Sequence, residues 1–319
     1  MHILVTGGAG FIGSNFIFHQ MRKHPGDSLV CLDKLTYAGR YETLAEAVGE
    51  GKLCFIHGDI ADTALVKDIF QDHRPDIVVN FAAESHVDRS IANASDFVRT
   101  NVLGVQVLLD AVKAHACRFV QISTDEVYGD LPLDADEKFT EDSPLRPSSP
   151  YSASKAAADH LVLAYCRTYR LDAVIVRCAN NYGAFQYPEK LIPVIITRAL
   201  RGERVPLYSR GEHIRDWIYV DDCVRAIDLV MRHGAAGEVY HIGAEQLYAN
   251  ADVARMILSY LGCSQDLIAY VHDRVGHDLK YALDTRKIRD DLGFRPEISF
   301  EEGLERTTRW YRRNPDFWR

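Results

Sequence analysis

Five residues near the middle of the chain could carry out proton and hydride chemistry: Thr124, Asp125, Glu126, Tyr151 and Lys155. Tyr151 and Lys155 are four positions apart in YSASK, a spacing that puts them one turn apart on the same face of a helix. A phenol, with an ordinary pKa of about 10, is a weak base at neutral pH, but a nearby ammonium and an oxidised nicotinamide would both favour the phenolate. We therefore interpret Tyr151 and Lys155 as a hydride-transfer pair.

Asp125 and Glu126 add an acid and a base that a simple dehydrogenase does not need. Two neighbouring carboxyl groups in a closed pocket cannot both ionise freely, so one tends to stay protonated while the other acts as the base. The set therefore predicts an elimination combined with an oxidation. Ser152 and Lys155 also match the S-x-x-K pattern of acylating serine enzymes, but the S-D-N and K-T-G elements of those enzymes are absent from the sequence.

A glycine-rich segment, TGGAGFIG at 6–13, indicates a dinucleotide cradle. Gly7 permits a tight turn, Gly10 lets the backbone approach a pyrophosphate, and Gly13 lets the following helix pack closely on the strand. Asp33 follows Gly13 by 20 residues, where a carboxylate can accept both hydroxyls of an adenosine ribose. Because a carboxylate there repels a 2′-phosphate, NAD is predicted rather than NADP, and the adjacent Lys34 is interpreted as a surface lysine.

The segments around these motifs alternate between short β-rich runs and helical patterns. Strands are expected at 2–6, 28–33, 53–59, 76–83, 118–124 and 172–178, and helices at 12–23, 63–72, 95–115 and 151–169. This order predicts an α/β fold with a Rossmann-type, doubly wound parallel sheet covered on both faces. Ligands of such sheets bind beyond the carboxyl ends of the strands, which is where Asp125 and Glu126 are expected. Asp59, at the end of the third strand, is expected to contact adenine or to cap a turn.

The rhythm becomes irregular after Cys178, where prolines interrupt short segments. We predict a NAD-binding domain over 1–178, to which 213–241 returns, and a smaller nucleotide-sugar-binding domain over 179–319. Helical patterns in the second part occur at 221–233, 251–261 and 300–313.

Composition excludes several other classes of protein. The chain has 319 residues, 47% of them hydrophobic and 26% charged, with a net charge of −8, so no basic stripe is present that could bind nucleic acid. Seven widely spaced cysteines without a C-x-x-C pair predict reduced thiols in the cytoplasm. Neither an N-terminal leader nor a run of about 18 apolar residues occurs, so no membrane span is expected. The 13 histidines show no H-E-x-x-H or H-x-H spacing, and no metal site is predicted.

Taken together, the motifs resemble the extended branch of the short-chain dehydrogenase/reductase superfamily, and most closely the dTDP-glucose 4,6-dehydratases. The specific segment is STDEVYGDLP, since related epimerases and reductases share the glycines and the Tyr-Lys pair but lack the adjacent Asp-Glu. Further matching segments are TGGAGFIGS, DKLTYAG, FAAESHVDRS, SSPYSASKAAADHLV, NNYG, YPEKLIP, IRDWIYV and GHD.

The resemblance implies a role for each of the five reactive residues. Tyr151 would take the proton of the sugar 4-hydroxyl while a hydride passes from carbon 4 to NAD. Glu126 would then remove the proton of carbon 5, and Asp125 would protonate the departing 6-hydroxyl before the hydride returns to carbon 6. Thr124 would hydrogen-bond the 4-hydroxyl. Lys155 would orient the nicotinamide ribose and keep Tyr151 basic.

The resemblance also implies binding residues and an assembly state. NAD would contact the glycine cradle, Tyr151, Lys155 and a set of strand-end residues: Phe11, Ile12, Asp33, Lys34, Leu35, Thr36, Asp59, Ile60, Phe81, Ala82, Ala83, Thr100 and Asn181. The nucleotide-diphosphate hexose would contact Ser85, Thr124, Asn180, Lys190, Leu191, Ile192, Pro193, Pro206, Leu207, Tyr208, Arg215, Asn250, Asp273, Arg274, Gly276 and His277. Arg215 and Arg274 suit a diphosphate because guanidinium groups form paired hydrogen bonds with phosphates. A homodimer is expected through the helices at 95–115 and 151–169.

Two alternatives remain open at this point. A UDP-sugar 4,6-dehydratase or a nucleotide-sugar 4-epimerase could use the same Tyr-Lys pair, and a non-reactive NAD-responsive binding protein could keep the cradle without turnover. Competing substrates in one assay separate dTDP from UDP preference, epimer formation without dehydration would indicate an epimerase, and bound NAD without turnover of any nucleotide hexose would indicate a binding protein.

Overall fold

The computed structural model describes residues 1–273 and 276–318. Its centre is a parallel sheet in which, over the described residues, seven strands follow the order β10-β6-β5-β4-β1-β2-β3. The strands are β1 (His2–Thr6), β2 (Ser28–Asp33), β3 (Cys54–His57), β4 (Ile77–Asn80), β5 (Arg118–Thr124), β6 (Ala173–Cys178) and β10 (Val239–Ile242). The predicted Rossmann-type α/β fold is therefore confirmed.

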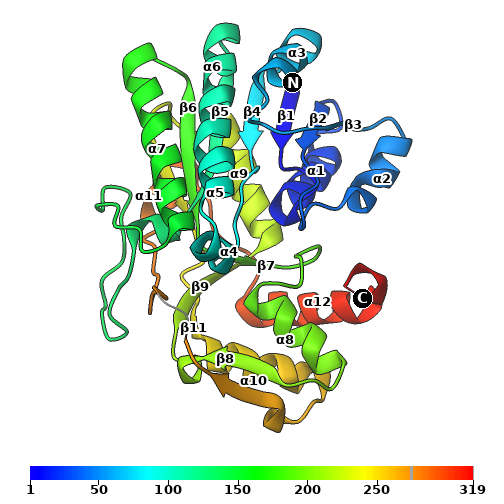
Figure 1. Cartoon of the computed structure of the whole chain (residues 1–319), viewed down its shortest axis with the longest axis vertical. Coiled ribbons are helices and arrows are strands. Elements are labelled where there is room, and N and C mark those ends of the chain that lie inside the picture. Colours follow the sequence, from blue (N-terminus) through cyan, green and yellow to red (C-terminus); the bar gives the residue numbers. More distant parts are fainter. Residues whose placement is uncertain (274–275, 319) are drawn as a thin grey trace.

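Helices cover both faces of this sheet (Figure 1). One face carries α1 (Phe11–Lys23), α2 (Tyr41–Gly49), α9 (Val220–His233) and α11 (Arg286–Leu292), and the other carries α3 (Thr63–His73), α6 (Val105–His115) and α7 (Pro150–Tyr169). Side chains alternate between the faces along each strand, so Ile3 and Val5 pack on the first face and Leu4 on the second. Because both faces are buried, apolar residues dominate most of the strands.

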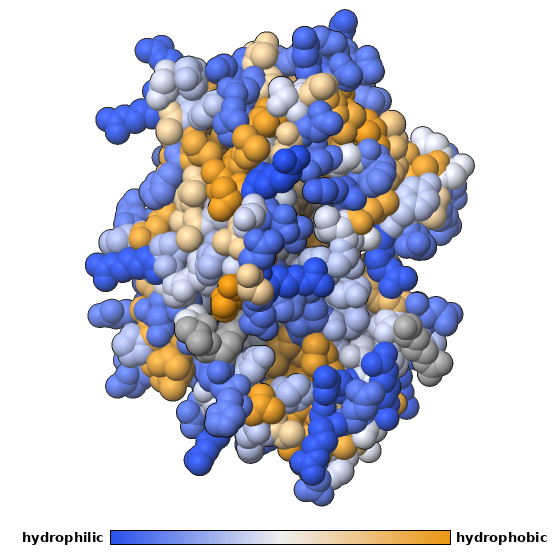
Figure 2. Space-filling view, viewed as in Figure 1, coloured by the Kyte–Doolittle hydropathy of each residue, from blue (hydrophilic) through white to orange (hydrophobic). Residues whose placement is uncertain are grey.

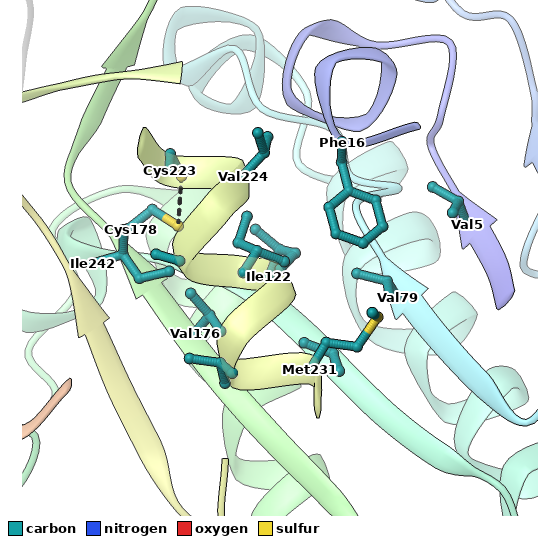
Figure 3. Packing of buried hydrophobic residues seen from close by; sticks show 14 of the residues in the cluster. Val5, Phe16, Val79, Ile122, Val176, Cys178, Cys223, Val224, Met231 and Ile242 are labelled. Atoms are coloured by element: carbon teal, nitrogen blue, oxygen red, sulfur yellow. Dashed lines mark hydrogen bonds between the residues drawn. The ribbon is translucent and has the colours of Figure 1, made fainter. Parts of the chain in front are cut away.

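The core between α9 and the sheet is drawn in Figure 3, where Phe16 and Met231 lie beside strand residues such as Val79 and Ile122. Cys178 at the end of β6 and Cys223 on α9 face each other there, with their sulfur atoms 3.8 Å apart. All seven cysteines are free thiols.

The smaller lobe lies beyond the carboxyl ends of the strands (Figure 1). It contains a three-stranded sheet, a two-stranded sheet and three helices around a core of their own. These elements are β7 (Asn180–Tyr182), β9 (Ile214–Tyr219) and β11 (Leu247–Ala249) in the first sheet, β8 (Val205–Tyr208) and β12 (Ile268–Val271) in the second, and the helices α8 (Leu191–Leu200), α10 (Asn250–Leu261) and α12 (Phe300–Arg313).

The chain passes between the two parts more than once. After β9 in the smaller lobe, it continues into α9 against α1 and then into β10, which pairs with β6 at the edge of the main sheet. The expected helix at 95–115 consists of three consecutive pieces, α5 (Ser95–Phe97), the π-helical segment η1 (Val98–Gly104) and α6. A short helix, α4 (Val87–Ala92), precedes them. Among the described residues, no helix is both long and apolar enough to cross a membrane.

Candidate active site

A cavity of about 600 Å³ lies where the carboxyl ends of the main sheet meet the smaller lobe. Its lining includes the ends of β1, β2, β4 and β5 on one side and residues of α8, β8 and β9 on the other. Residues that are distant in sequence, such as Gly7, Asp125, Tyr151 and Arg215, therefore border one space.

The glycine cradle forms the turn between β1 and α1. Gly7 has a φ of +69°, and a Cβ atom on it would lie 2.5 Å from the backbone nitrogen of Ala82. A Cβ on Gly13 would overlap the carbonyl oxygen of Gly7. Helix α1 begins after Gly10 without a side-chain cap, so its first N–H groups are available to an anion at the positive end of the helix. The absence of side chains here fits a pyrophosphate.

Asp33 lies at the end of β2, buried, with both carboxylate oxygens held by backbone N–H groups. Ala9 N donates to Oδ2 at 2.9 Å and Leu35 N donates to Oδ1 at 2.7 Å. Burial raises the pKa of Asp33, while these two hydrogen bonds oppose the rise. The carboxylate is thus fixed at the cavity wall.

Lys34 and Asp59 form an ion pair at the same end of the cavity. Lys34 Nζ is 2.9 Å from Asp59 Oδ2, and the other oxygen of Asp59 accepts from Ala61 N at 2.9 Å. Burial alone would raise the pKa of Asp59, but the hydrogen bond from Ala61 and the charge of Lys34 lower it overall. Because Lys34 is paired with Asp59, it does not provide a free cation for the 2′-phosphate of NADP. The preference for NAD that follows from Asp33 is therefore unchanged.

The acidic pair follows β5 directly. Thr124 is the last residue of the strand, and its hydroxyl donates to Asp125 Oδ1 at 3.1 Å and accepts from the backbone N–H of Glu126 at 3.3 Å. Asp125 is 2% exposed, and its Oδ2 has no hydrogen-bond partner within the described part of the chain. Burial, followed by the charge of Glu126, raises the pKa of Asp125 to about 8. Asp125 therefore keeps its proton at neutral pH and can act as an acid.

Tyr151 and Lys155 lie in the first turns of α7, which starts with a capping box at Ser149 and Ser152. Both side chains are buried and border the cavity. Burial, together with the charges of Glu126 and Asp125, raises the pKa of Tyr151 well above its ordinary value, and a hydrogen bond with Thr124 opposes the rise. Without a bound cation the phenol therefore holds its proton.

Lys155 is fixed from below by the main sheet. Its Nζ donates to the carbonyl of Ile122 at 2.5 Å, and burial lowers its pKa to about 8, while the charge of Asp159 raises it. Asp159 lies one turn further along α7 and pairs with Arg177 on β6, whose Nε is 2.9 Å from Oδ2. The lysine thus lies near the buried ion pair of Asp159 and Arg177.

On the side of the cavity formed by the smaller lobe, the lining includes the long side chains of Arg215 and Lys190. Arg215 on β9 is 5% exposed, donates to the carbonyls of Asp278 at 2.7 Å and Leu279 at 3.1 Å, and packs 4.3 Å above the ring of Tyr281. Lys190, before α8, donates to the carbonyl of Ser85 at 2.7 Å. The contact between Lys190 and Ser85 connects the smaller lobe to the segment after β4.

Sequence comparison identifies the family. The sequence model described as GDP-mannose 4,6 dehydratase matches residues 4–307. The chain belongs to this family. The dTDP-glucose 4,6-dehydratase of Streptomyces niveus is 50% identical over 100% of this chain and 95% of its own length.

Two solved structures extend the comparison. The dTDP-glucose 4,6-dehydratase DesIV of Streptomyces venezuelae, with NAD and dTDP bound, has a TM-score of 0.96 and 48% identity over 100% of this chain and 99% of its own. The UDP-glucose 4-epimerase of Thermotoga maritima has a TM-score of 0.92 at 32% identity, covering 99% and 100%. Because the two backbones fit almost equally well, the side chains at the site must carry the distinction between dehydration and epimerisation.

Most of the binding residues predicted from the sequence border the cavity of this protein. Among those that the structure describes, four do not: Leu35, Pro193, Asp273 and Gly276. Leu35 turns its side chain into the hydrophobic core with a φ of +52° and reaches the site only through its N–H, which holds Asp33. Pro193 is buried in the first turns of α8. Asp273 is bound to His213 and His277, and Gly276 has no side chain to offer. The prediction for Arg274 lies outside the described residues.

The cavity also contains residues that sequence reasoning missed. Prominent among them are Glu84, His86, Gln186, Glu189, Trp217 and Tyr281. Asn101, in the π-helical turn, supports the site indirectly, because it bonds both backbone groups of Glu84 and donates to Ser154 on α7 at 2.8 Å. Glu189 lies next to Lys190 in the segment YPEKLIP and Tyr281 closely follows GHD, so proximity to those motifs was the available signal.

Proposed function

We propose that the protein is an NAD-dependent dTDP-glucose 4,6-dehydratase, which converts dTDP-glucose to dTDP-4-keto-6-deoxyglucose and water. The observation that carries this proposal is the burial of Asp125 beside Glu126 in the same cavity as Tyr151, which raises the pKa of Asp125. An epimerase needs the tyrosine and the cofactor but has no use for a carboxylic acid that delivers a proton to a leaving hydroxyl. Dehydration requires both an acid and a base, and the two neighbouring carboxyls can supply them.

Each residue of the site then has one task. Tyr151 takes the proton of the 4-hydroxyl, and Thr124, whose hydroxyl already bonds Asp125, bonds the same sugar oxygen. Glu126 removes the proton of carbon 5, which is acidic beside a 4-keto group. Asp125 gives its proton to the 6-hydroxyl, which leaves as water. Glu126 returns its proton to carbon 5 at the end. The proton that Tyr151 took from the 4-hydroxyl passes to Asp125 through the hydroxyl of Thr124, which bonds both side chains, so the protein finishes in its starting state.

The cradle and Asp33 fit NAD, and Lys155 would bond its nicotinamide ribose. NAD bound there would supply the acceptor for the hydride of carbon 4 and the donor of that hydride to carbon 6, and its positive charge would lie near Tyr151. That charge favours the phenolate and opposes the burial that keeps Tyr151 protonated in the free protein. Proton removal from the sugar is therefore coupled to the presence of the oxidised cofactor.

Product analysis tests the proposal. The protein, saturated with NAD and given dTDP-glucose without an external reductant, should form the 4-keto-6-deoxy sugar with the loss of one water and no net change in NAD. UDP-glucose in a parallel reaction should be converted at a lower kcat/KM. Formation of the 4-epimer, or any product that keeps its carbon 6 oxygen, would contradict the proposal. Bound NAD without turnover of any nucleotide hexose would favour a binding protein instead.

We also propose a homodimer in the cytoplasm. Large apolar side chains are exposed on consecutive helices, with Ile91 on α4 46% exposed, Val98 and Leu103 on η1 54% and 44%, and Tyr169 on α7 52%. Hydrophobic residues gather over these helices on the face seen in Figure 2. Burial of such a patch against a second copy would remove it from water, and the free thiols suit a reducing compartment. Sedimentation of the protein at micromolar concentration should give twice the mass of one chain.

A further inference from the structure

Arg177 is a charged residue in an otherwise apolar strand. It lies in β6, whose sequence is AVIVRC, and its side chain is 2% exposed. Its register partners are Ser123 on β5 and His241 on β10, and the next residue, Cys178, borders the cavity. A buried ion pair adds little stability compared with apolar residues of similar size. Stability alone therefore does not explain a guanidinium at this position.

One side of the guanidinium is bound to helix α7, which packs beside β6 (Figure 1). Arg177 Nε donates to Asp159 Oδ2 at 2.9 Å. Asp159 follows Lys155 by four residues and Tyr151 by eight, so the three side chains lie on one face of the helix. Burial raises the pKa of Asp159, and the charge of Arg177 is the largest influence that opposes the rise. Arg177 therefore stabilises a carboxylate whose charge favours the ammonium of Lys155.

The other side of the guanidinium is bound to the turn that carries the two acids. Asp125 and Glu126 belong to the 3-10 turn η2 (Asp125–Tyr128), whose last residue is Tyr128. Arg177 Nη1 donates to the Tyr128 hydroxyl at 2.6 Å. The guanidinium thus makes one contact with helix α7 and another with the turn that follows β5.

Further contacts hold the side chain of Tyr128. Its hydroxyl is 2.6 Å from His241 Nε2, and His241 Nδ1 is 2.9 Å from the carbonyl oxygen of Asp284. Burial lowers the pKa of His241 to about 3, so the imidazole is neutral and its Nδ1 carries the proton donated to Asp284. The Tyr128 hydroxyl therefore donates to Nε2 and accepts from Arg177. Phe139 is stacked on the ring of Tyr128, with centroids 4.9 Å apart. These contacts fix Tyr128 and, through the short turn, the two acids.

We propose that Arg177 is a positioning residue that fixes the acid-bearing turn η2 relative to helix α7, which carries Tyr151 and Lys155. Arg177 does not border the cavity, so it acts through the residues that it bonds. The inference rests on the proposed function, in which oxidation at carbon 4 depends on Tyr151 and elimination depends on the two acids. Both steps act on one hexose ring, and misplacement of a reacting group by about 1 Å can lower a rate by about 10².

A single turnover of dTDP-glucose with NAD bound tests the proposal, because the two ends of the network should fail in different ways. Tyr128→Phe removes the hydroxyl at the turn and keeps the pair of Arg177 and Asp159, so oxidation should continue while elimination slows. The absorbance of reduced nicotinamide should therefore build up, and turnover should fall by about tenfold or more. Asp159→Asn removes the charge that favours the ammonium of Lys155, so oxidation itself should slow and no build-up should occur.

Two further variants sharpen the test. Arg177→Lys keeps a positive charge beside Asp159, but one ammonium lacks the fork that bonds two partners, so this variant should behave like Tyr128→Phe. Tyr240→Phe is the matched control. It removes another buried tyrosine hydroxyl, which accepts from Ala235 N at 3.1 Å on the far side of β10 from these contacts, and it should turn over like the unaltered protein. Circular dichroism should show that all variants are folded.

Several outcomes would overturn the proposal. These are an unaltered rate in Tyr128→Phe or Arg177→Lys, slower turnover of either without a build-up of reduced nicotinamide, or a build-up in Asp159→Asn. Urea unfolding tests the coupling without turnover. Because Tyr128→Phe and Asp159→Asn both act on Arg177, their effects on the free energy of unfolding should not add, whereas those of Tyr240→Phe and Asp159→Asn should add. Additive effects in the first pair would also overturn the proposal. If the unaltered protein forms no 4-keto-6-deoxy sugar, the proposed function fails, and the unfolding comparison still decides whether Arg177 couples the turn to the helix.

Discussion

The two walls of the cavity are built in different ways. The cofactor wall is formed by the strand ends of one sheet, and its central feature is the absence of side chains at Gly7 and Gly13. The opposite wall is formed by small sheets and connecting segments, and its central features are the long side chains of Lys190, Arg215 and Tyr281. We conclude that cofactor binding depends on backbone shape and substrate binding depends on side-chain reach. Asp125 and Glu126 lie between the two walls, and we expect their replacement to change neither cofactor binding nor substrate binding.

The largest expected effect is a loss of turnover without a loss of cofactor binding. The double change Asp125→Asn with Glu126→Gln removes the acid and the base, so kcat should fall by about 10²–10⁴, while the affinity for NAD, measured by calorimetry, should stay the same. Asp136→Asn, at an exposed position after the site, is the matched control and should keep full activity. Unchanged turnover in the double variant would show that the acids play no part.

The cofactor wall should be damaged by adding a single methyl group. In Gly7→Ala the new Cβ would press against the backbone of Ala82, and the residue would have to keep a φ of +69°. A left-handed conformation alone costs a non-glycine residue about 1–2 kcal/mol, so NAD binding should weaken by about tenfold or more. Gly26→Ala serves as the control, because nothing lies within 4 Å of its added Cβ. Normal NAD affinity in Gly7→Ala would contradict the shape argument.

The opposite wall should respond to the loss of a single guanidinium. Arg215→Lys keeps the charge but loses the forked hydrogen bonds to Asp278 and Leu279 and the stacking on Tyr281. We expect the KM for dTDP-glucose to rise by roughly tenfold with a smaller change in kcat, because these contacts position the substrate side. The affinity for NAD should not change, and Arg204→Lys, at an exposed position, should match the unaltered protein. If Arg215→Lys weakened the binding of NAD and of the substrate equally, the two walls would not have separate binding roles.

The last expected effect concerns the stability of the fold rather than binding, and its dependence on pH. The pKa of Asp125 is about 8 in the folded protein, whereas an unfolded chain releases that proton near pH 4. Between these values the folded state binds more protons, so the contribution of Asp125 to stability falls as pH rises. Asp125→Asn lacks this penalty, so its stability relative to the unaltered protein should be highest at pH 8 and above, with the gap closing toward pH 4. Urea unfolding at several pH values measures the gap, and a gap that is constant with pH would argue against a buried acid.

The comparison of the walls also explains how far the sequence could predict the structure. The strands and the cradle could be predicted because each has a regular pattern in the sequence. An example is the spacing of 20 residues between Gly13 and Asp33. Family, fold and NAD dependence are supported by the relatives. The roles of the individual site residues stay predictions.

The remaining details depend on three-dimensional packing. In the run from Lys190 to Pro193, successive residues of a helix point in different directions, so Lys190 borders the cavity while Pro193 does not. Leu35 was expected as a contact because the family resemblance extends over Asp33 to Thr36, yet its αL conformation packs the side chain against the core. His213 meets His277 only because β9 and the segment after β12 lie close together in the fold, and no spacing within the sequence encodes that meeting.

The place of β10 at the edge of the main sheet has a practical consequence for anyone who wishes to divide this protein. A fragment that ends at Cys178 would leave one side of β6 without its partner, with a row of bare amide and carbonyl groups beside an apolar face that α9 normally covers. Such an edge recruits other chains. The amino-terminal half expressed by itself should therefore precipitate, and the whole molecule should melt in a single cooperative transition.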